Sequence, residues 1–157
     1  MIDETDRSIL AQLQDNARVS NSEIARQIGM APSAVLERIR KLEKRGVIQG
    51  YEVRIAPAAV GAELLAYVLV RTDEPAAQCT TGIELAKLPE VLEVHHIAGE
   101  DCYLAKVRTS GTAALGNLLR HSVGAIPTVI GTKTTIVLSS QKESSRLPLD
   151  SAEAGDD

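Results

Sequence analysis

The stretch from residue 30 to residue 46, MAPSAVLERIRKLEKRG, has the residue types that bind a polyanion. Five of the eight residues from Arg38 to Arg45 are Arg or Lys, although the chain as a whole has a formal net charge of −4. Such side chains can neutralise phosphates and form hydrogen bonds with base edges. A charge run of this kind is more often a solvated helix face. The neighbouring sequence must therefore decide between the two interpretations.

On a helix, the stretch separates into two sides. Val35, Ile39 and Leu42 recur with helical spacing and form a narrow apolar stripe. The opposite side carries mainly polar and charged residues, with Leu36 at its edge: Ser33, Glu37, Arg40, Lys41 and Lys44. If the apolar stripe faces a core, this second side is free to contact a partner.

The preceding sequence predicts two further helices, over residues 3–17 and 20–29. Ser20 and Glu23 have capping-box spacing, and Gly29 is a typical C-terminal stop. Pro32 suits the first turn of the third helix, which Gly46 ends. Three short helices with a tight turn before the third are typical of a helix-turn-helix, whose last helix enters the major groove of double-stranded DNA.

This placement assigns a role to each exposed residue of the third helix. Arg40 can donate two hydrogen bonds to guanine, Glu37 can accept one from cytosine, and Leu36 can contact a thymine methyl group. The residues expected at base edges are Ser33, Ala34, Leu36, Glu37 and Arg40. The residues expected at phosphates are Arg38, Lys41 and Lys44.

The rest of the chain predicts a second domain. Residues 47–55 have β character and predict a short strand or wing, and the small residues of 56–63 suggest a linker. Strands are expected over 64–71, 90–98, 101–108 and 131–139, and helices over 74–88 and 111–123. The order βαββαβ is that of a ferredoxin-like sandwich. We therefore predict an α+β protein with four parts: a helix-turn-helix (winged) domain at 1–50, a strand and linker at 51–63, a ferredoxin-like domain at 64–140, and a disordered acidic tail at 141–157.

The first domain resembles that of the leucine-responsive regulator/AsnC family, the feast/famine transcription regulators. The matching marks are Asp3 and Asp6 with Ile9-Leu10, the segment SEIA, and a pattern through Val35, Arg38, Ile39, Leu42, Glu43, Gly46 and Ile48. The resemblance covers residues 2 to 140. One departure is Ala31, where the family often has Ser. Alanine provides no side-chain cap for the helix, which costs about 1 kcal/mol.

The resemblance implies a small-molecule pocket in the second domain, with amino acids as the effectors. The family's turn matches Gly99 and Asp101 here, although Gly99-Glu100-Asp101 can equally be a plain tight turn. Asp101 would accept the ammonium group of an amino acid, and turn amides with Thr132 and Thr134 would hold its carboxylate. The predicted effector residues are His96, Ile97, Gly99, Glu100, Asp101, Tyr103, Thr132 and Thr134.

Assembly is predicted from the strand at 64–71, whose Leu64, Leu65, Val68, Leu69 and Val70 cannot all face the helices. An exposed apolar sheet face is usually buried against another copy, so we expect a homodimer and, by the resemblance, tetramers or octamers. An effector would shift the equilibrium between assembly states and so change the spacing of the DNA-binding domains.

Several function classes are disfavoured by composition. Three Tyr with no Phe or Trp argue against base stacking, and Cys79 and Cys102 lack zinc-site spacing. His95 and His96 would point to opposite faces of a strand, so they cannot share a metal ion. We find no P-loop, GxGxxG or nucleophile motif. We therefore expect that the protein is not an enzyme. We also expect no metal site and no cofactor beyond the effector.

The N-terminal half is more basic than the net charge suggests. Residues 1–50 hold eight Lys and Arg against seven Asp and Glu, so the acidic total does not exclude DNA. We find no apolar run of the roughly 20 residues that span a bilayer, and predict a cytoplasmic protein without membrane contact. Two alternatives remain: an architectural protein that coats DNA with little sequence preference, and a small ligand-binding or metabolic ferredoxin-like module.

Overall fold

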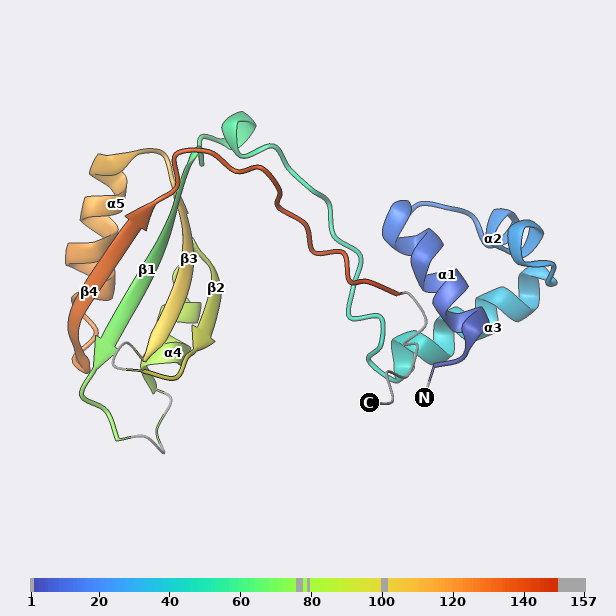
Figure 1. Ribbon diagram of the computed structural model, residues 1–157, viewed down its shortest axis with the longest axis horizontal. Helices are drawn as coiled ribbons and strands as arrows, with labels where there is room; N and C mark the ends of the chain where they lie inside the picture. The colour runs from blue at the N-terminus through green and yellow to red at the C-terminus, as the bar shows by residue number, and fades with distance from the viewer. Residues whose placement is uncertain (1, 76–77, 79, 100–101, 150–157) are drawn as a thin grey trace, which may run out of the picture. The chain divides into compact units, whose positions relative to one another are not determined.

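The chain is divided into two compact units, Met1–Arg54 with Glu143–Asp157, and Ile55–Lys142. The computed structural model describes residues 2–75, 78, 80–99 and 102–149. Figure 1 shows a helical N-terminal unit and a C-terminal unit built on one sheet. Within the described residues, no helix is long and apolar enough to cross a membrane.

The N-terminal unit contains the three predicted helices, α1 (Glu4–Asp15), α2 (Asn21–Ile28) and α3 (Pro32–Lys44). Asp3 and Asp6 form a reciprocal capping box at the start of α1. The side chain of Ser20 caps α2 by accepting the N–H of Glu23 at 3.1 Å. Gly29 ends α2 with φ +67°, a left-handed conformation that glycine adopts without strain. These local signals produce the predicted helix-turn-helix.

A small aliphatic core holds these helices together. Its buried members come from all three helices: Ile9, Ile24, Ala25, Val35 and Ile39. The predicted stripe of α3 is confirmed, because Val35, Ile39 and Leu42 are all buried. The orientation of α3 is therefore fixed, with its other side toward solvent.

The C-terminal unit has one four-stranded antiparallel sheet in the order β2-β3-β1-β4. The strands are β1 (Leu64–Thr72), β2 (Val91–His96), β3 (Tyr103–Thr109) and β4 (Val129–Ile136). The helices are α4 (Thr80–Ala86) and α5 (Thr112–Leu118), the latter continuing into a single π turn at Leu119–Val123. This element order and strand order confirm the ferredoxin-like prediction.

The two faces of the sheet differ. Val68 and Val70 of β1 face the helices and share a core with Leu85 of α4 and Leu118 of α5. Leu69 alternates with them and pairs with Leu104 of β3 on the other face. Both leucines are only partly buried. One face is therefore packed, and the other leaves the Leu69–Leu104 pair partly exposed between the strand positions of Lys106 and Lys133.

The prediction of a strand over residues 47–55 is wrong. The segment is irregular, and the short 3-10 helix η1 (Pro57–Val60) follows it. Val53 and Ile55 are exposed by 85% and 62%, whereas Ile48 packs against the core of the N-terminal unit. Residue types alone do not make a strand, because β structure depends on a neighbouring strand and a surface to pack on.

Two other boundaries also differ from prediction. The helix expected over 74–88 starts only at Thr80, because the carboxylate of Glu74 binds back to the start of α4. The disorder predicted from residue 141 does not extend to Arg146 and Leu147, which contact α1. Gln14 forms two hydrogen bonds with the backbone of Leu147, and Arg146 forms an ion pair with Asp15 at 2.6 Å. The acidic residues 150–157 lie outside the described part.

Candidate nucleic-acid interface and ligand pocket

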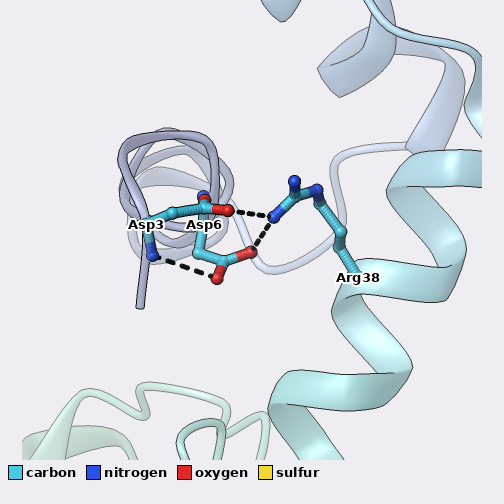
Figure 2. A network of polar contacts seen from close by, with 3 residues as sticks. All are labelled: Asp3, Asp6 and Arg38. Atoms are coloured by element: carbon cyan, nitrogen blue, oxygen red, sulfur yellow. Dashed lines mark hydrogen bonds and ion pairs between the residues drawn. The ribbon is translucent and has the colours of Figure 1, made fainter. Parts of the chain in front are cut away.

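Arg38 lies on the flank of α3 that meets α1. One nitrogen of its guanidinium, Nη1, is 2.7 Å from both Asp3 Oδ2 and Asp6 Oδ1 (Figure 2). The pKa of Asp3 is lowered, first by the hydrogen bond from the backbone of Asp6 and then by Arg38. The same carboxylates raise the pKa of Arg38. The structure thus gives Arg38 a partner inside its own unit, which differs from the phosphate contact predicted for it.

The opposite side of α3 carries the other predicted DNA-contacting residues. Five of them line one shallow hollow in the surface: Ser33, Ala34, Leu36, Glu37 and Arg40. Ser33, Glu37 and Arg40 are exposed, and Ala34 and Leu36 are partly buried. Lys41 and Lys44 are exposed further along the helix. Every predicted base-contacting residue therefore lies together on one accessible surface.

The positively charged side chains on this surface have no ion-pair partner among the described residues. Within the described residues, Arg40, Lys41 and Lys44 form no ion pair, whereas Arg38 forms two. The start of α3 is also open, because Ala31 provides no side-chain cap and Pro32 occupies the first turn. Free N–H groups at a helix start attract anions such as phosphate. The surface can therefore bind a polyanion without first breaking internal contacts.

A pocket of about 470 Å³ lies in the C-terminal unit. One wall is the end of β1 and the chain after it: Thr72, Glu74, Pro75 and Gln78. The other wall is the end of β2 and the connection to β3: His96, Ile97, Ala98, Gly99 and Cys102. The volume suits a small organic ligand.

Glu74 is the only carboxylate among the described residues that line this pocket. Its Oε2 accepts the hydroxyl of Thr80 at 2.5 Å and the N–H of Thr81 at 3.1 Å, and its Oε1 accepts the hydroxyl of Tyr103 at 2.7 Å. Partial burial raises the pKa of Glu74, but these hydrogen bonds outweigh it and lower the pKa to about 2. Glu74 is therefore ionised at neutral pH.

Thr72 adds a second polar group to the pocket. Its side chain is 9% exposed, and its hydroxyl has no hydrogen-bond partner among the described residues. A buried hydroxyl without a partner costs about 1–3 kcal/mol. A ligand atom able to hydrogen-bond with Thr72 would remove that cost.

Tyr103 lies in the core beneath the pocket. It is 3% exposed, and its ring packs against Gly82 of α4, where a Cβ would come within 2.7 Å of Tyr103 Cε1. The ring of His96 stacks on it at a centroid distance of 5.0 Å. Glycine at position 82 thus lets α4 approach closely enough for Tyr103 to hold Glu74.

The predicted effector residues are only partly brought together. His96, Ile97 and Gly99 line the pocket. Tyr103 is buried and contacts two of the lining residues, Glu74 and His96. Glu100 and Asp101 lie outside the described residues. Thr132 and Thr134 are on β4, which β1 and β3 separate from β2, and neither lines the pocket.

Glu74 and Thr72 were not among the residues predicted from the sequence. The helix predicted over residues 74–88 would have included Glu74. The available signal was an acidic residue directly after a strand and shortly before the Thr80-Thr81 pair, where a carboxylate can cap the next helix.

A helix-turn-helix with a free basic surface, joined to a ferredoxin-like unit with a ligand-sized pocket, defines a DNA-binding regulator. Residues 2–49 match the family model of winged helix-turn-helix DNA-binding domains. Residues 65–147 match that of the Lrp/AsnC ligand binding domain.

Relatives match over nearly the whole chain. The HTH-type transcriptional regulator FL11 of Pyrococcus horikoshii is 38% identical over 94% of this chain and 97% of that protein. The leucine-responsive regulatory protein of Escherichia coli is 36% identical over 93% of this chain and 90% of that protein. A transcriptional regulator of Neisseria meningitidis, solved as a complex with L-methionine, is 28% identical and superposes with a TM-score of 0.88 over 96% of this chain and 98% of that one. The chain therefore belongs to the Lrp/AsnC family and is a transcription regulator, not an enzyme.

Proposed function

We propose that this regulator acts in the cytoplasm, where it reads a specific double-stranded DNA site with the exposed side of α3 and responds to an amino acid bound in its C-terminal unit. The observation that carries the DNA-reading proposal is the division of α3 into two sides. Its apolar stripe is buried and Arg38 is held by α1, whereas Arg40 and its neighbours are free.

The base contacts are proposed for the residues around the hollow on α3. Arg40 donates to guanine, Glu37 accepts from cytosine, and Leu36 contacts a thymine methyl group. Ser33 and Ala34, one turn earlier, lie against neighbouring base edges. Lys41 and Lys44 neutralise phosphates and set the position of the helix on the duplex. Each unit supplies few cations, so useful affinity needs two units on one assembly.

The proposed assembly is a homodimer through the open face of the sheet. Leu69 and Leu104 are paired across β1 and β3 on this face, and Tyr67 lies beside them on β1. All three are only partly buried. An apolar strip on a two-layer fold is typically covered by another copy. Dimers then associate further into tetramers or octamers.

The dimer proposal predicts that Leu69→Glu lowers the molecular mass in solution. A carboxylate at the centre of the strip would have to be desolvated on assembly, so the variant is expected to be monomeric. Light scattering after size-exclusion chromatography measures the mass of the wild type and the variant. Ile83→Glu, at an exposed position of α4 on the helix-covered side of the sheet, is the control. A monomeric wild type would contradict the proposal.

The effector proposal is supported by the pocket and by the family. A volume of about 470 Å³ with one ionised carboxylate and one unpaired hydroxyl suits a small zwitterion. The regulator of N. meningitidis was solved with L-methionine. An amino acid that binds one assembly state more tightly shifts the population toward that state, and with it the spacing of the DNA-binding units.

Selection of bound fragments from a random pool of duplex DNA, with and without the twenty amino acids, tests this function. A consensus with two related half-sites supports sequence-specific reading. Strongly salt-dependent binding without any consensus would instead identify an architectural protein. An amino acid that alters the footprint or the sedimentation profile supports effector control. An unchanged footprint and profile with all twenty would contradict it.

A further inference from the structure

The wall of the C-terminal pocket contains a negative charge without a cationic partner. The groups that hold Glu74 are the hydroxyls of Thr80 and Tyr103 and the backbone N–H of Thr81, and the Thr81 hydroxyl also lowers its pKa; all of these groups are neutral. Within the described residues, Glu74 forms no ion pair with Lys, Arg or His. The three hydrogen bonds fix the carboxylate in place and leave its charge uncompensated.

The remaining hydrogen-bonding capacity of Glu74 is small and directional. Thr80, Tyr103 and the backbone N–H of Thr81 occupy most of the roughly four lone-pair sites of the carboxylate, and the Thr81 hydroxyl also lies close to it. None of these donors carries a charge, so a charged donor would add more affinity at this carboxylate than another neutral one. Because Glu74 lines the pocket, that donor can come from a ligand.

The other groups of the pocket narrow the class of ligand. Thr72, the last residue of β1, supplies a hydroxyl that has no partner among the described residues. Pro75, Ile97 and Ala98 contribute apolar surface beside the polar side chains of Gln78 and His96. No Lys or Arg is among the described lining residues, so a second negative charge on the ligand would find no cation there.

We infer that Glu74 is the residue that receives the ammonium group of the effector, and that the pocket selects α-amino acids with uncharged, mainly apolar side chains. This inference rests on the proposed effector function and assigns its recognition chemistry. The hydroxyl of Thr72 donates to the ligand's carboxylate. Tyr103 acts as a positioning residue, since it holds Glu74 without lining the pocket.

The experiment compares two ligands and three proteins by isothermal titration calorimetry on the full chain. The ligands are L-methionine and its α-hydroxy acid analogue, which has a hydroxyl in place of the ammonium group. The proteins are the wild type, Glu74→Gln, and the control Glu84→Gln, which removes an exposed carboxylate of α4 outside the pocket. Circular dichroism checks that each variant is folded.

The expected result is a wild type that binds L-methionine about tenfold to hundredfold more tightly than the hydroxy acid, since a charged hydrogen bond is lost with the ammonium group. Glu74→Gln should lose most of this preference, and Glu84→Gln should keep it. If Glu74→Gln fails to fold, Tyr103→Phe takes its place; it removes one of the donors that fix Glu74 and should weaken the preference. Equal binding of both ligands by the wild type, or an unchanged preference in folded Glu74→Gln, would overturn the assignment to Glu74.

A different result separates this inference from the effector function itself. If none of the twenty amino acids binds the wild type at millimolar concentration, the effector proposal fails and the Glu74 assignment fails with it. If an amino acid with a charged side chain binds most tightly, the effector proposal stands and the inferred selectivity is wrong.

Discussion

The exposed side of α3 and the C-terminal pocket hold their charges in different ways. On α3, Arg40, Lys41 and Lys44 form no ion pair within the described residues. In the pocket, the carboxylate of Glu74 already accepts three hydrogen bonds. A long polyanion can be met by flexible cations whose positions adjust to it, because its charge is repeated along the duplex. A small ligand offers one ammonium group, so the acceptor must be fixed beforehand.

The same contrast appears within α3 itself, between Arg38 and Arg40. Arg38 is bound to Asp3 and Asp6, and the side chain of Asp6 is only 10% exposed. Arg40 is exposed and borders the hollow at the start of the helix. Two arginines separated by a single residue therefore differ in their contacts, and we propose that Arg38 holds the fold whereas Arg40 contacts DNA.

The largest effect on stability is expected from Arg38→Ala. The substitution leaves the carboxylate of Asp6 nearly buried and without its cation, which should lower the free energy of unfolding of the N-terminal unit by about 1–2 kcal/mol. Arg40→Ala is the matched control and should change it by less than about 0.5 kcal/mol. Urea denaturation followed by circular dichroism measures both. Equal losses would mean that the two arginines do not differ in role.

A smaller effect, with a defined pH dependence, is expected from Tyr103→Phe. The folded pKa of Glu74, about 2, lies below its usual value of about 4.3. The ionised carboxylate therefore stabilises the fold above about pH 4.5, and this contribution is lost as the pH falls toward about 2. Removing the Tyr103 hydroxyl should cost about 1 kcal/mol at pH 7 and less at pH 3.

Urea midpoints of the wild type and Tyr103→Phe at pH 7 and pH 3 test this prediction. Tyr67→Phe, on the open face of the sheet, is the control and should show no such change with pH. A gap between wild type and Tyr103→Phe that stays constant from pH 7 to pH 3 would show that the hydroxyl does not act through the charge of Glu74.

The smallest effect is expected from removing the C-terminal segment. Truncation after Lys142 deletes the hydrogen bonds between Gln14 and Leu147 and the ion pair of Arg146 with Asp15. These contacts are exposed, so the loss should be below about 1 kcal/mol. Hydrogen exchange should rise in α1 and stay unchanged in β1. Truncation after Leu149 is the control, and equal exchange in the two truncations would refute the docking of residues 143–149.

Much of the N-terminal unit could be predicted because its signals are local. Ser20, Gly29 and the spacing of Val35, Ile39 and Leu42 each act within a few residues. The role of Arg38 could not be predicted in this way. Its partners Asp3 and Asp6 lie more than thirty residues earlier, and only the packing of α1 on α3 brings them together.

The pocket was harder to predict for the same reason. Glu74 acquires its role from Tyr103, 29 residues later, and from the close approach of α4 at Gly82. Thr132 and Thr134 were assigned without the strand order, which places β3 and β1 between β2 and β4. The segment 47–55 had β-forming residues but gained no partner strand. In each case a contact distant in sequence decided the outcome.

The most direct test of the central claim is DNA selection with the wild type and Arg40→Ala. The variant should keep its fold but lose the preference for guanine at one position of each half-site, with affinity for the selected site reduced about tenfold to hundredfold. Preferences at the other positions should persist. If Arg40→Ala selects the same bases as the wild type at every position and with the same affinity, the exposed side of α3 does not read DNA through Arg40.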